Sequence, residues 1–236
     1  KIGEEGQKKL KKSTITILGL GGIGSRSAEL AARAGIGKLN LIDRDIVDKS
    51  NLQRQTLYNE EDINKPKAFV IKEKLEKINS EINILTKFKD ITYKNIEANV
   101  KGDLVLDCSD NMETRFLLNE YCIENNIPWI YSSVIGSAGM VFNIIPKKTP
   151  CFRCLFSEPE EQLGTCETEG IINTIPSLIS SIQITEALKF LTKQLTTKEL
   201  IYYDIWKQWR KEVKGELKCQ KTNSETLLKI FSKSEP

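Results

Sequence analysis

The sequence predicts an α/β protein with a mostly parallel sheet, helices on both faces of that sheet, and a C-terminal part with antiparallel strands. Two observations support this fold class. Short apolar, β-branched runs alternate with longer helical stretches through residues 14–125, and a glycine-rich turn joins the first run to the first helix. Strand–helix alternation of this kind is typical of a parallel sheet that is covered on both sides.

The apolar runs and the helical stretches give the order of the elements. We expect strands at residues 14–20, 38–42, 82–88, 103–106, 129–135 and 140–145, and helices at residues 25–34, 67–78 and 112–125. Residues 127–146 carry no charge, but glycines, serines and flanking prolines interrupt the run. Two buried strands therefore explain this segment better than a membrane-spanning helix, and we expect no membrane association.

The chain changes character after residue 150. Residues 150–170 read as irregular, and Pro176 suits the first turn of a helix that reaches Leu191. Residues 199–204 and 206–213 predict an antiparallel hairpin. We therefore divide the chain into an α/β half at residues 1–150, a continuation of the same domain at residues 151–214, and a polar tail at residues 215–236.

The composition excludes several classes of function. The 35 basic and 32 acidic residues leave a net charge of +3, so we expect no nucleic-acid partner, because such proteins usually concentrate basic residues on one face. The chain has no histidine, which excludes Ser-His-Asp and Cys-His catalysis and any histidine-ligated metal within it. Six cysteines without a secretory signal favour metal binding or thiol chemistry in a cytoplasmic protein over a disulfide scaffold.

The turn after the first expected strand is a candidate phosphate site. It carries four glycines: Gly19, Gly21, Gly22 and Gly24. Glycine lets the backbone turn tightly and approach a phosphate, and the start of the following helix offers unpaired N–H groups. Asp43 ends the next strand, where a carboxylate can accept hydrogen bonds from a ribose. The pattern indicates a Rossmann-like nucleotide fold, which NAD enzymes also use.

Two cations distinguish this chain from a hydride-transfer enzyme. Arg54 follows Asp45 in the segment SNLQRQ, and a guanidinium can pair with phosphate oxygens bidentately. The other interpretation of this segment is the start of a surface helix capped by Ser50 or Asn51. Lys67 stands at a helix entrance, against the preference of helix N-termini for acids, which indicates an anion nearby. The alternative is an exposed lysine in a lysine-rich chain.

Acidic and amide side chains follow the strand expected at residues 103–106. Ligands of open parallel sheets bind beyond the carboxyl ends of the strands, where Asp110 suits Mg²⁺ as a hard oxygen ligand. Alternatively, Asp110 or Asn111 caps the next helix, and each residue can take one of the two roles. We expect Cys108 and Cys122 to pack in the core.

Together these residues resemble the ThiF/MoeB/HesA family, the bacterial and archaeal relatives of the ubiquitin-activating enzymes. The matching segments, in order, are GLGGIG (19–24), LID (41–43), SNLQRQTL (50–57), KPK (65–67), LDCSDN (106–111), CFRC (151–154), TCE (165–167) and EALK (186–189). The resemblance implies an adenylyltransferase that binds ATP with Mg²⁺ and a small ubiquitin-like sulfur carrier ending in Gly-Gly. It implies that the carrier's carboxylate attacks the α-phosphate and that pyrophosphate leaves.

The resemblance also implies a role for each candidate residue. It implies that the glycine turn around Gly22 contacts the nucleotide and that Asp43 contacts the ribose. The phosphates are assigned to Ser50, Asn51, Arg54 and Lys67, and the Mg²⁺ to Asp110, with Asp45 and Asn111 completing the expected set. Family members usually form homodimers, and residues 151–214 are expected to carry the carrier-protein, crossover and dimer contacts.

The chain departs from the family pattern at two points. The family carries an arginine upstream of the position of Lys1 that reaches across the dimer to the phosphates; it is either lost or encoded before Lys1. A four-thiolate zinc site needs two CxxC pairs; Cys151 and Cys154 form one, whereas Cys219 is followed by a threonine at position 222. A zinc site of three cysteines completed by Glu216 or water, and a degenerate site without metal, both stay open.

Several functions stay open at this stage. The first is the carrier-protein adenylyltransferase of a thiamin, molybdopterin or tRNA-thiolation pathway. Cys166 aligns with a cysteine that some members use to form a thioester or acyl-disulfide, although Glu167 and Glu169 disfavour its thiolate, and a loop cysteine without a role is the alternative. The other functions are an NAD-dependent oxidoreductase, a relative that adenylates a peptide or tRNA base, and a binding subunit without turnover. Arg54 together with Asp110 argues against the oxidoreductase.

Overall fold

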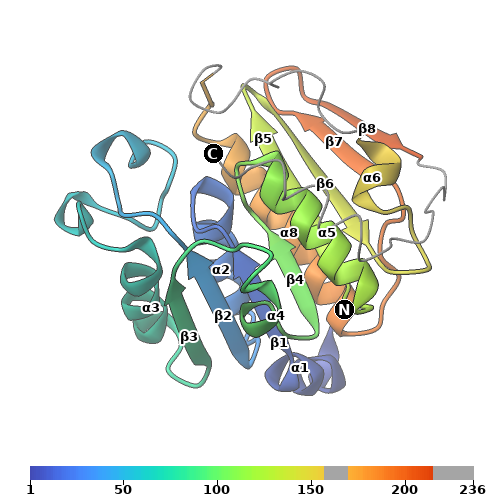
Figure 1. The fold of residues 1–236 in the computed structure, drawn as a ribbon, viewed down its shortest axis with the longest axis horizontal. Helices are drawn as coiled ribbons and strands as arrows, with labels where there is room; N and C mark the ends of the chain where they lie inside the picture. Colours follow the sequence, from blue (N-terminus) through green and yellow to red (C-terminus); the bar gives the residue numbers. More distant parts are fainter. Residues whose placement is uncertain (157–169, 215–236) are drawn as a thin grey trace.

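The computed structural model of this chain describes residues 1–156 and 170–214. Strands and helices alternate along it as expected (Figure 1). In chain order the elements are α1 (Gly3–Lys12), β1 (Thr14–Leu18), α2 (Gly22–Arg33), β2 (Lys38–Asp43), η1 (Lys49–Asn51), η2 (Glu60–Asp62), α3 (Lys67–Ile78), β3 (Asn83–Phe88), α4 (Ile96–Asn99), β4 (Leu104–Asp107), α5 (Met112–Glu124), β5 (Trp129–Ile135), β6 (Ala138–Ile144), α6 (Phe152–Leu155), α8 (Ile175–Leu191), β7 (Leu200–Asp204) and β8 (Trp209–Val213).

The described strands form one eight-stranded sheet in the order β3-β2-β1-β4-β5-β6-β7-β8. Neighbours from β3 to β5 are parallel, and neighbours from β5 to β8 are antiparallel. The register places Leu18 beside Ile42 on one side and beside Asp107 on the other. The carboxyl ends of β1, β2 and β4 therefore meet where the strand order reverses, which is the position at which open α/β sheets bind ligands.

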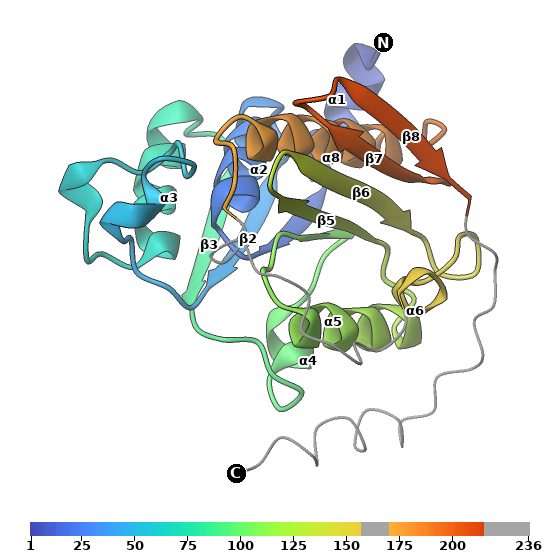
Figure 2. The same ribbon diagram turned by 90° about the horizontal axis from the view of Figure 1, so that it is seen from above.

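Helices cover both faces of the sheet, with α2 and α8 on one face and α4 and α5 on the other (Figure 2). Because successive strand residues point to opposite faces, β5 contributes to two separate cores. Ile130 packs in the core that includes Ile179 of α8. Trp129 packs in the core that includes Leu118 of α5.

The predicted fold class is confirmed, and the differences are local. α2 begins at Gly22 rather than Ser25, because the glycine turn already supplies the first helical carbonyl, which accepts the Ser25 N–H at 3.0 Å. The short helix α6 replaces part of the expected irregular segment. The uncharged run folds as the antiparallel pair β5–β6, and the expected hairpin is β7–β8. No described helix combines the length and the apolar character needed to cross a bilayer.

Candidate active site

A cavity of about 500 Å³ opens at the edge of the sheet where β1, β2 and β4 end. This volume lies within the range of small-molecule sites. Of the residues expected to bind ligand, the cavity is lined by Gly19, Gly21, Gly22, Asp43, Asp45, Arg54, Lys67, Asp110 and Asn111. Segments that lie far apart in the sequence thus contribute to one site.

Glycines shape the turn between β1 and α2. Gly19 has a φ of +86°, and a Cβ there would lie 2.5 Å from the carbonyl oxygen of Cys108. A Cβ at Gly24 would lie 1.9 Å from the carbonyl oxygen of Gly19. Only glycine fits such close backbone approaches. Gly24 therefore packs the helix against the turn and does not line the cavity, whereas Gly21 and Gly22 do.

Asp43 fixes the same turn from the end of β2. The N–H of Leu20 donates to its Oδ2 atom at 2.5 Å, and the N–H of Asp45 donates to its Oδ1 atom at 2.6 Å. Burial raises the pKa of Asp43, while Lys67 and the two N–H donors act in the opposite direction. On the other side of the turn, the Tyr58 hydroxyl donates to the carbonyl oxygen of Leu20 at 2.8 Å. Leu20 is thus held at both its backbone N–H and its carbonyl oxygen.

Lys67 is a buried cation, so the interpretation as an exposed lysine was wrong. It is the first residue of α3, and its Nζ atom donates to Asp45 Oδ2. Its backbone N–H donates to the Asp45 carbonyl oxygen at 3.0 Å. An ammonium group has three donors, so Lys67 can bind Asp45 and an anion in the cavity together.

Arg54 lines the cavity just after η1, and its Nη1 atom donates to the carbonyl oxygen of Ser50 at 3.3 Å. The cap of η1 is Asp48, which accepts the Ser50 N–H at 2.7 Å, and not Ser50 or Asn51. The cavity lining does not include Ser50 or Asn51. The backbone carbonyl oxygen of Asn51 accepts the Arg54 backbone N–H at 3.1 Å. Phosphate binding by Ser50 and Asn51 stays a prediction.

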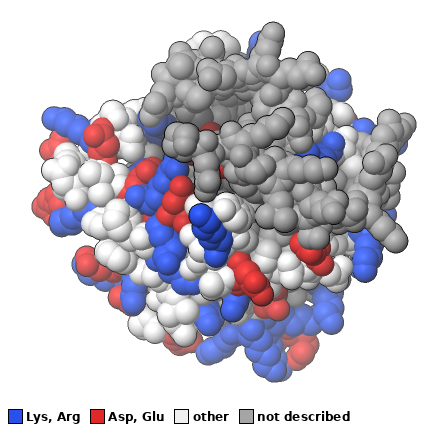
Figure 3. Space-filling view, in the orientation of Figure 1, with Lys and Arg blue, Asp and Glu red and all other residues white. Residues whose placement is uncertain are grey.

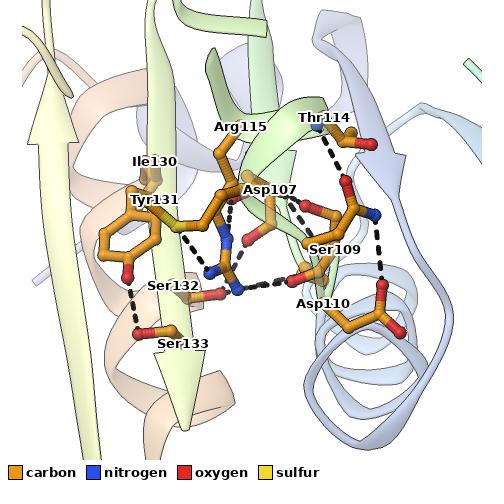
Figure 4. Close-up of polar contacts among 12 residues, drawn as sticks. Asp107, Ser109, Asp110, Thr114, Arg115, Ile130, Tyr131, Ser132 and Ser133 are labelled. Atoms are coloured by element: carbon orange, nitrogen blue, oxygen red, sulfur yellow. Dashed lines mark hydrogen bonds and ion pairs between the residues drawn. The ribbon is translucent and has the colours of Figure 1, made fainter. Parts of the chain in front are cut away.

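The turn after β4 divides two roles between neighbouring residues (Figure 4). Asn111 caps α5, because its Oδ1 atom accepts the Thr114 N–H at 2.8 Å. Asp110 is exposed, lines the cavity and accepts a hydrogen bond from Asn111 Nδ2 at 3.2 Å. Because the side chain of Asn111 caps α5, the carboxylate of Asp110 is available to bind a cation.

Residues 1–224 match the model of the ThiF family. The chain belongs to the ThiF family. It is 39% identical over 217 residues to the sulfur carrier protein ThiS adenylyltransferase of Bacillus subtilis, covering 91% of this chain and 65% of that protein. It is 37% identical over 193 residues to the ThiS adenylyltransferase of Escherichia coli, covering 81% of this chain and 77% of that protein.

The fold of this ThiF-family chain also matches solved structures. The structure of Escherichia coli MccB with ATP superposes with a TM-score of 0.80 at 26% identity, covering 89% of this chain and 66% of that chain. The present chain therefore spans less than two thirds of the length of MccB and of the Bacillus subtilis relative. The family assignment and the fold agree with the resemblance read from the sequence.

The CxxC pair of this ThiF-family chain lies at the start of α6. The Sγ atoms of Cys151 and Cys154 are 3.6 Å apart, and a backbone N–H of α6 donates to buried Asn119 at 2.9 Å. Two thiolates on one tetrahedral zinc ion lie about 3.8 Å apart, given Zn–S bonds of about 2.3 Å, so the pair fits zinc. Cys166 and Cys219 lie outside the described residues. Within the described ranges no three Cys, Asp or Glu side chains form a metal-binding group.

Sequence reasoning missed part of the cavity lining. The missed residues include Arg44, Gln55, Lys89, Asp90, Ile91, Ser109, Thr114, Arg115, Ser133, Val134, Ile171 and Pro176. Arg44 pairs with Asp90 at 3.0 Å. Acidic and basic side chains are interspersed on the part of the face that Figure 3 draws in colour. Gln55 and Ser109 stand inside the matching segments, whereas most of the others belong to no motif.

Proposed function

We propose that this chain adenylates the C-terminal glycine carboxylate of a ubiquitin-like sulfur-carrier protein, using ATP and releasing pyrophosphate. The observation that carries the proposal is the convergence of Lys67, Arg54 and Asp110 on one cavity with the glycine turn. Two relatives named ThiS adenylyltransferase, at 39% and 37% identity, support the acceptor class. The similar fold of MccB, solved with ATP, supports the nucleotide.

The reaction suits the side chains that line the cavity. A carboxylate oxygen of the carrier forms a bond to the α-phosphorus, the bond to the bridging oxygen breaks, and its electron pair leaves with pyrophosphate. Such a substitution depends on alignment and on compensation of negative charge, which Lys67 and Arg54 supply. A C-terminal carboxylate, with a reference pKa of about 3.5, is already ionised at neutral pH. No general base is needed, in agreement with a chain that lacks histidine.

Asp110 is the residue that would hold Mg²⁺ beside the nucleotide. Its carboxylate lines the cavity, and Asn111 has taken over the capping of α5. Hard divalent cations prefer oxygen ligands, so this side chain fits the ion. When bound, Mg²⁺ would neutralise phosphate charge; the chain's own part is to keep the carboxylate oriented toward the phosphates.

A structural zinc ion is a second part of the proposal, with Cys151, Cys154 and Cys219 as ligands and Glu216 or water as the fourth. The Sγ–Sγ separation of 3.6 Å in the first pair supports it. Metal analysis of protein purified without chelator tests the site, and fewer than about 0.2 zinc ions per chain would remove it. A Cys151→Ser variant is expected to contain less zinc than the wild type.

We propose that residues 1–150 bind the nucleotide and residues 151–214 contact the carrier in a cytoplasmic homodimer. Cys166 would then attack the carrier adenylate through its sulfur, forming a thioester as the bond to AMP breaks and AMP leaves. An acyl-disulfide would form in the same way only from a Cys166 persulfide, whose outer sulfur comes from a separate sulfur donor. A Cys166→Ser variant should keep pyrophosphate exchange and lose the covalent adduct on a non-reducing gel or in a mass spectrum. Light scattering at several protein concentrations tests the dimer.

The decisive experiment is ATP–pyrophosphate exchange against a panel of Gly-Gly-terminated carrier proteins. We expect exchange that requires one carrier, with Asp110→Ala inactive and the exposed neighbour variant Glu113→Ala active. A carrier without its last glycine is the matched substrate control. Separate reactions with short peptides and tRNA test the other acceptors, and a nicotinamide-binding assay tests the oxidoreductase. Absence of exchange with every carrier would overturn the proposal.

A further inference from the structure

A buried ion pair lies directly behind the turn that carries Asp110. Asp107 ends β4, and Arg115 projects from the first turn of α5, with side chains 0% and 12% exposed. The Arg115 Nε atom lies 3.6 Å from Asp107 Oδ2, and among the described residues this oxygen has no hydrogen-bond partner. The other carboxylate oxygen accepts the backbone N–H of Ser109 at 3.0 Å and its hydroxyl at 2.6 Å. Arg115 is therefore the counter-ion of Asp107.

Arg115 also holds the backbone of the turn. Its Nη2 atom donates to the carbonyl oxygen of Ser109 at 2.7 Å, and its guanidinium lies over the Tyr131 ring, 5.3 Å from the centroid (Figure 4). Ser109 is thus bound at its N–H and hydroxyl by Asp107 and at its carbonyl by Arg115. Because Asp110 is the next residue, this clamp fixes the backbone from which its carboxylate projects.

We propose that Arg115 is a positioning residue, which orients Asp110 toward the phosphates by holding Ser109 and by balancing the charge of Asp107. The inference rests on the proposed adenylation. Arg115 lines the cavity, but its polar contacts within the described residues go to Asp107, Ser109, Met112 and the Tyr131 ring. It therefore acts on the reaction through the turn.

Removal of the guanidinium makes the turn sensitive to pH. Burial raises the pKa of Asp107, and Arg115 is the strongest influence in the opposite direction. Asp107 also interacts electrostatically with four other titratable groups. These are Asp110 in the same turn, Cys108 beside it, Cys122 of α5 and Tyr131 of β5. None of these supplies a positive charge at neutral pH. Without Arg115 the carboxyl group remains protonated to higher pH, and the turn loosens as the group ionises.

Three variants test the clamp: Arg115→Met, the double variant Arg115→Met with Asp107→Asn, and the surface control Arg33→Met. Carrier-dependent pyrophosphate exchange is measured from pH 6.5 to 8.5. For Arg115→Met we expect kcat to fall about 10- to 100-fold, as for a misplaced group, with the KM for ATP changed less than about threefold. The loss grows as the pH rises. The double variant removes the pH dependence, and Arg33→Met behaves as the wild type.

Hydrogen exchange of residues 107–115, measured against an unfolded reference at each pH, provides a readout that does not need activity. We expect lower protection in Arg115→Met and restored protection in the double variant. A raised KM for ATP with unchanged kcat would overturn the inference. The inference also fails if the loss of kcat parallels the decrease in the midpoint of thermal unfolding at every pH. If the wild type shows no exchange with any carrier, the proposed function fails, whereas turn protection still decides whether the clamp exists.

Discussion

The Nζ atom of Lys67 lies 3.0 Å from Asp45 Oδ2, and the two side chains differ sharply in exposure, at 5% and 50%. The cation is enclosed by protein, while its partner faces solvent. Water screens the charge of Asp45 more than it screens that of Lys67. The ammonium group therefore keeps much of its attraction for a phosphate that enters the cavity.

Replacement of this lysine is expected to abolish most of the activity. Lys67→Ala removes a preorganised positive charge, and we expect carrier-dependent pyrophosphate exchange to fall about 100-fold or more. Lys65→Ala is the matched control, because this side chain is exposed and does not line the cavity. Wild-type exchange in Lys67→Ala would reject the role.

Arg54 gives a second prediction that separates charge from geometry. Arg54→Ala should lower exchange by about 100-fold. Arg54→Lys should recover only part of it, because lysine keeps the charge but lacks the planar fork of donors. The exposed neighbour Gln53 supplies the control Gln53→Ala, which we expect to match the wild type. Full activity in Arg54→Lys would mean that charge alone is required.

Asp110 and Asn111 should separate activity from stability. Asn111→Ala removes the cap of α5 and is expected to lower the free energy of unfolding by about 1 kcal/mol, whereas Asn111→Ser keeps a capping oxygen. Asp110→Ala should change that free energy by less than about 0.5 kcal/mol and remove Mg²⁺-dependent exchange. Urea denaturation and exchange assays on the same preparations check both. An unstable Asp110→Ala with an unchanged Asn111→Ala would reverse the assignment.

Cys108 and Cys122 should resist alkylation in the native protein. Burial raises the pKa of the Cys108 thiol to about 12 and also raises that of Cys122. A raised pKa keeps the thiol neutral as the pH increases, so at pH 8 only about one Cys108 in 10⁴ is a reactive thiolate. Peptide mapping after iodoacetamide treatment should find both residues unmodified in buffer and modified in urea. Native labelling faster than global unfolding would contradict their predicted inertness.

The element order and the glycine turn could be predicted because they depend on local patterns. Strand-length apolar runs, helical stretches and turn glycines each leave a signature over a few consecutive residues. The acid at the end of β2 was found in the same way, since Asp43 stands at a fixed place after the glycine turn. Local patterns also left ambiguity, because Asp110 and Asn111 are both good helix caps and only the observed hydrogen bond selects Asn111.

The remaining parts of the site depend on contacts between distant segments. Leu18 pairs with Asp107 across neighbouring strands, and no short stretch of sequence specifies that pairing. In the sequence Arg115 resembles any other helix residue, because only the fold brings the buried carboxylate of Asp107 beside it. The neighbours of Lys67 in the sequence leave an exposed lysine open as an alternative to a cation beside an anion, whereas the packing of α3 against the sheet buries it.

Leu20, held at its N–H by Asp43 and at its carbonyl oxygen by Tyr58, bears on how the proposed nucleotide binds. A loop that the protein's own side chains have already immobilised loses little further freedom on association. The Leu20 N–H is also occupied, and the Gly19 N–H donates to the Ile42 carbonyl oxygen at 2.9 Å. We therefore expect an incoming phosphate to meet the N–H groups of Gly21 and Gly22, which line the cavity. On the proposed function, affinity for the nucleotide then depends on how well the molecule fits a turn that is already formed, rather than on ordering of the turn during binding.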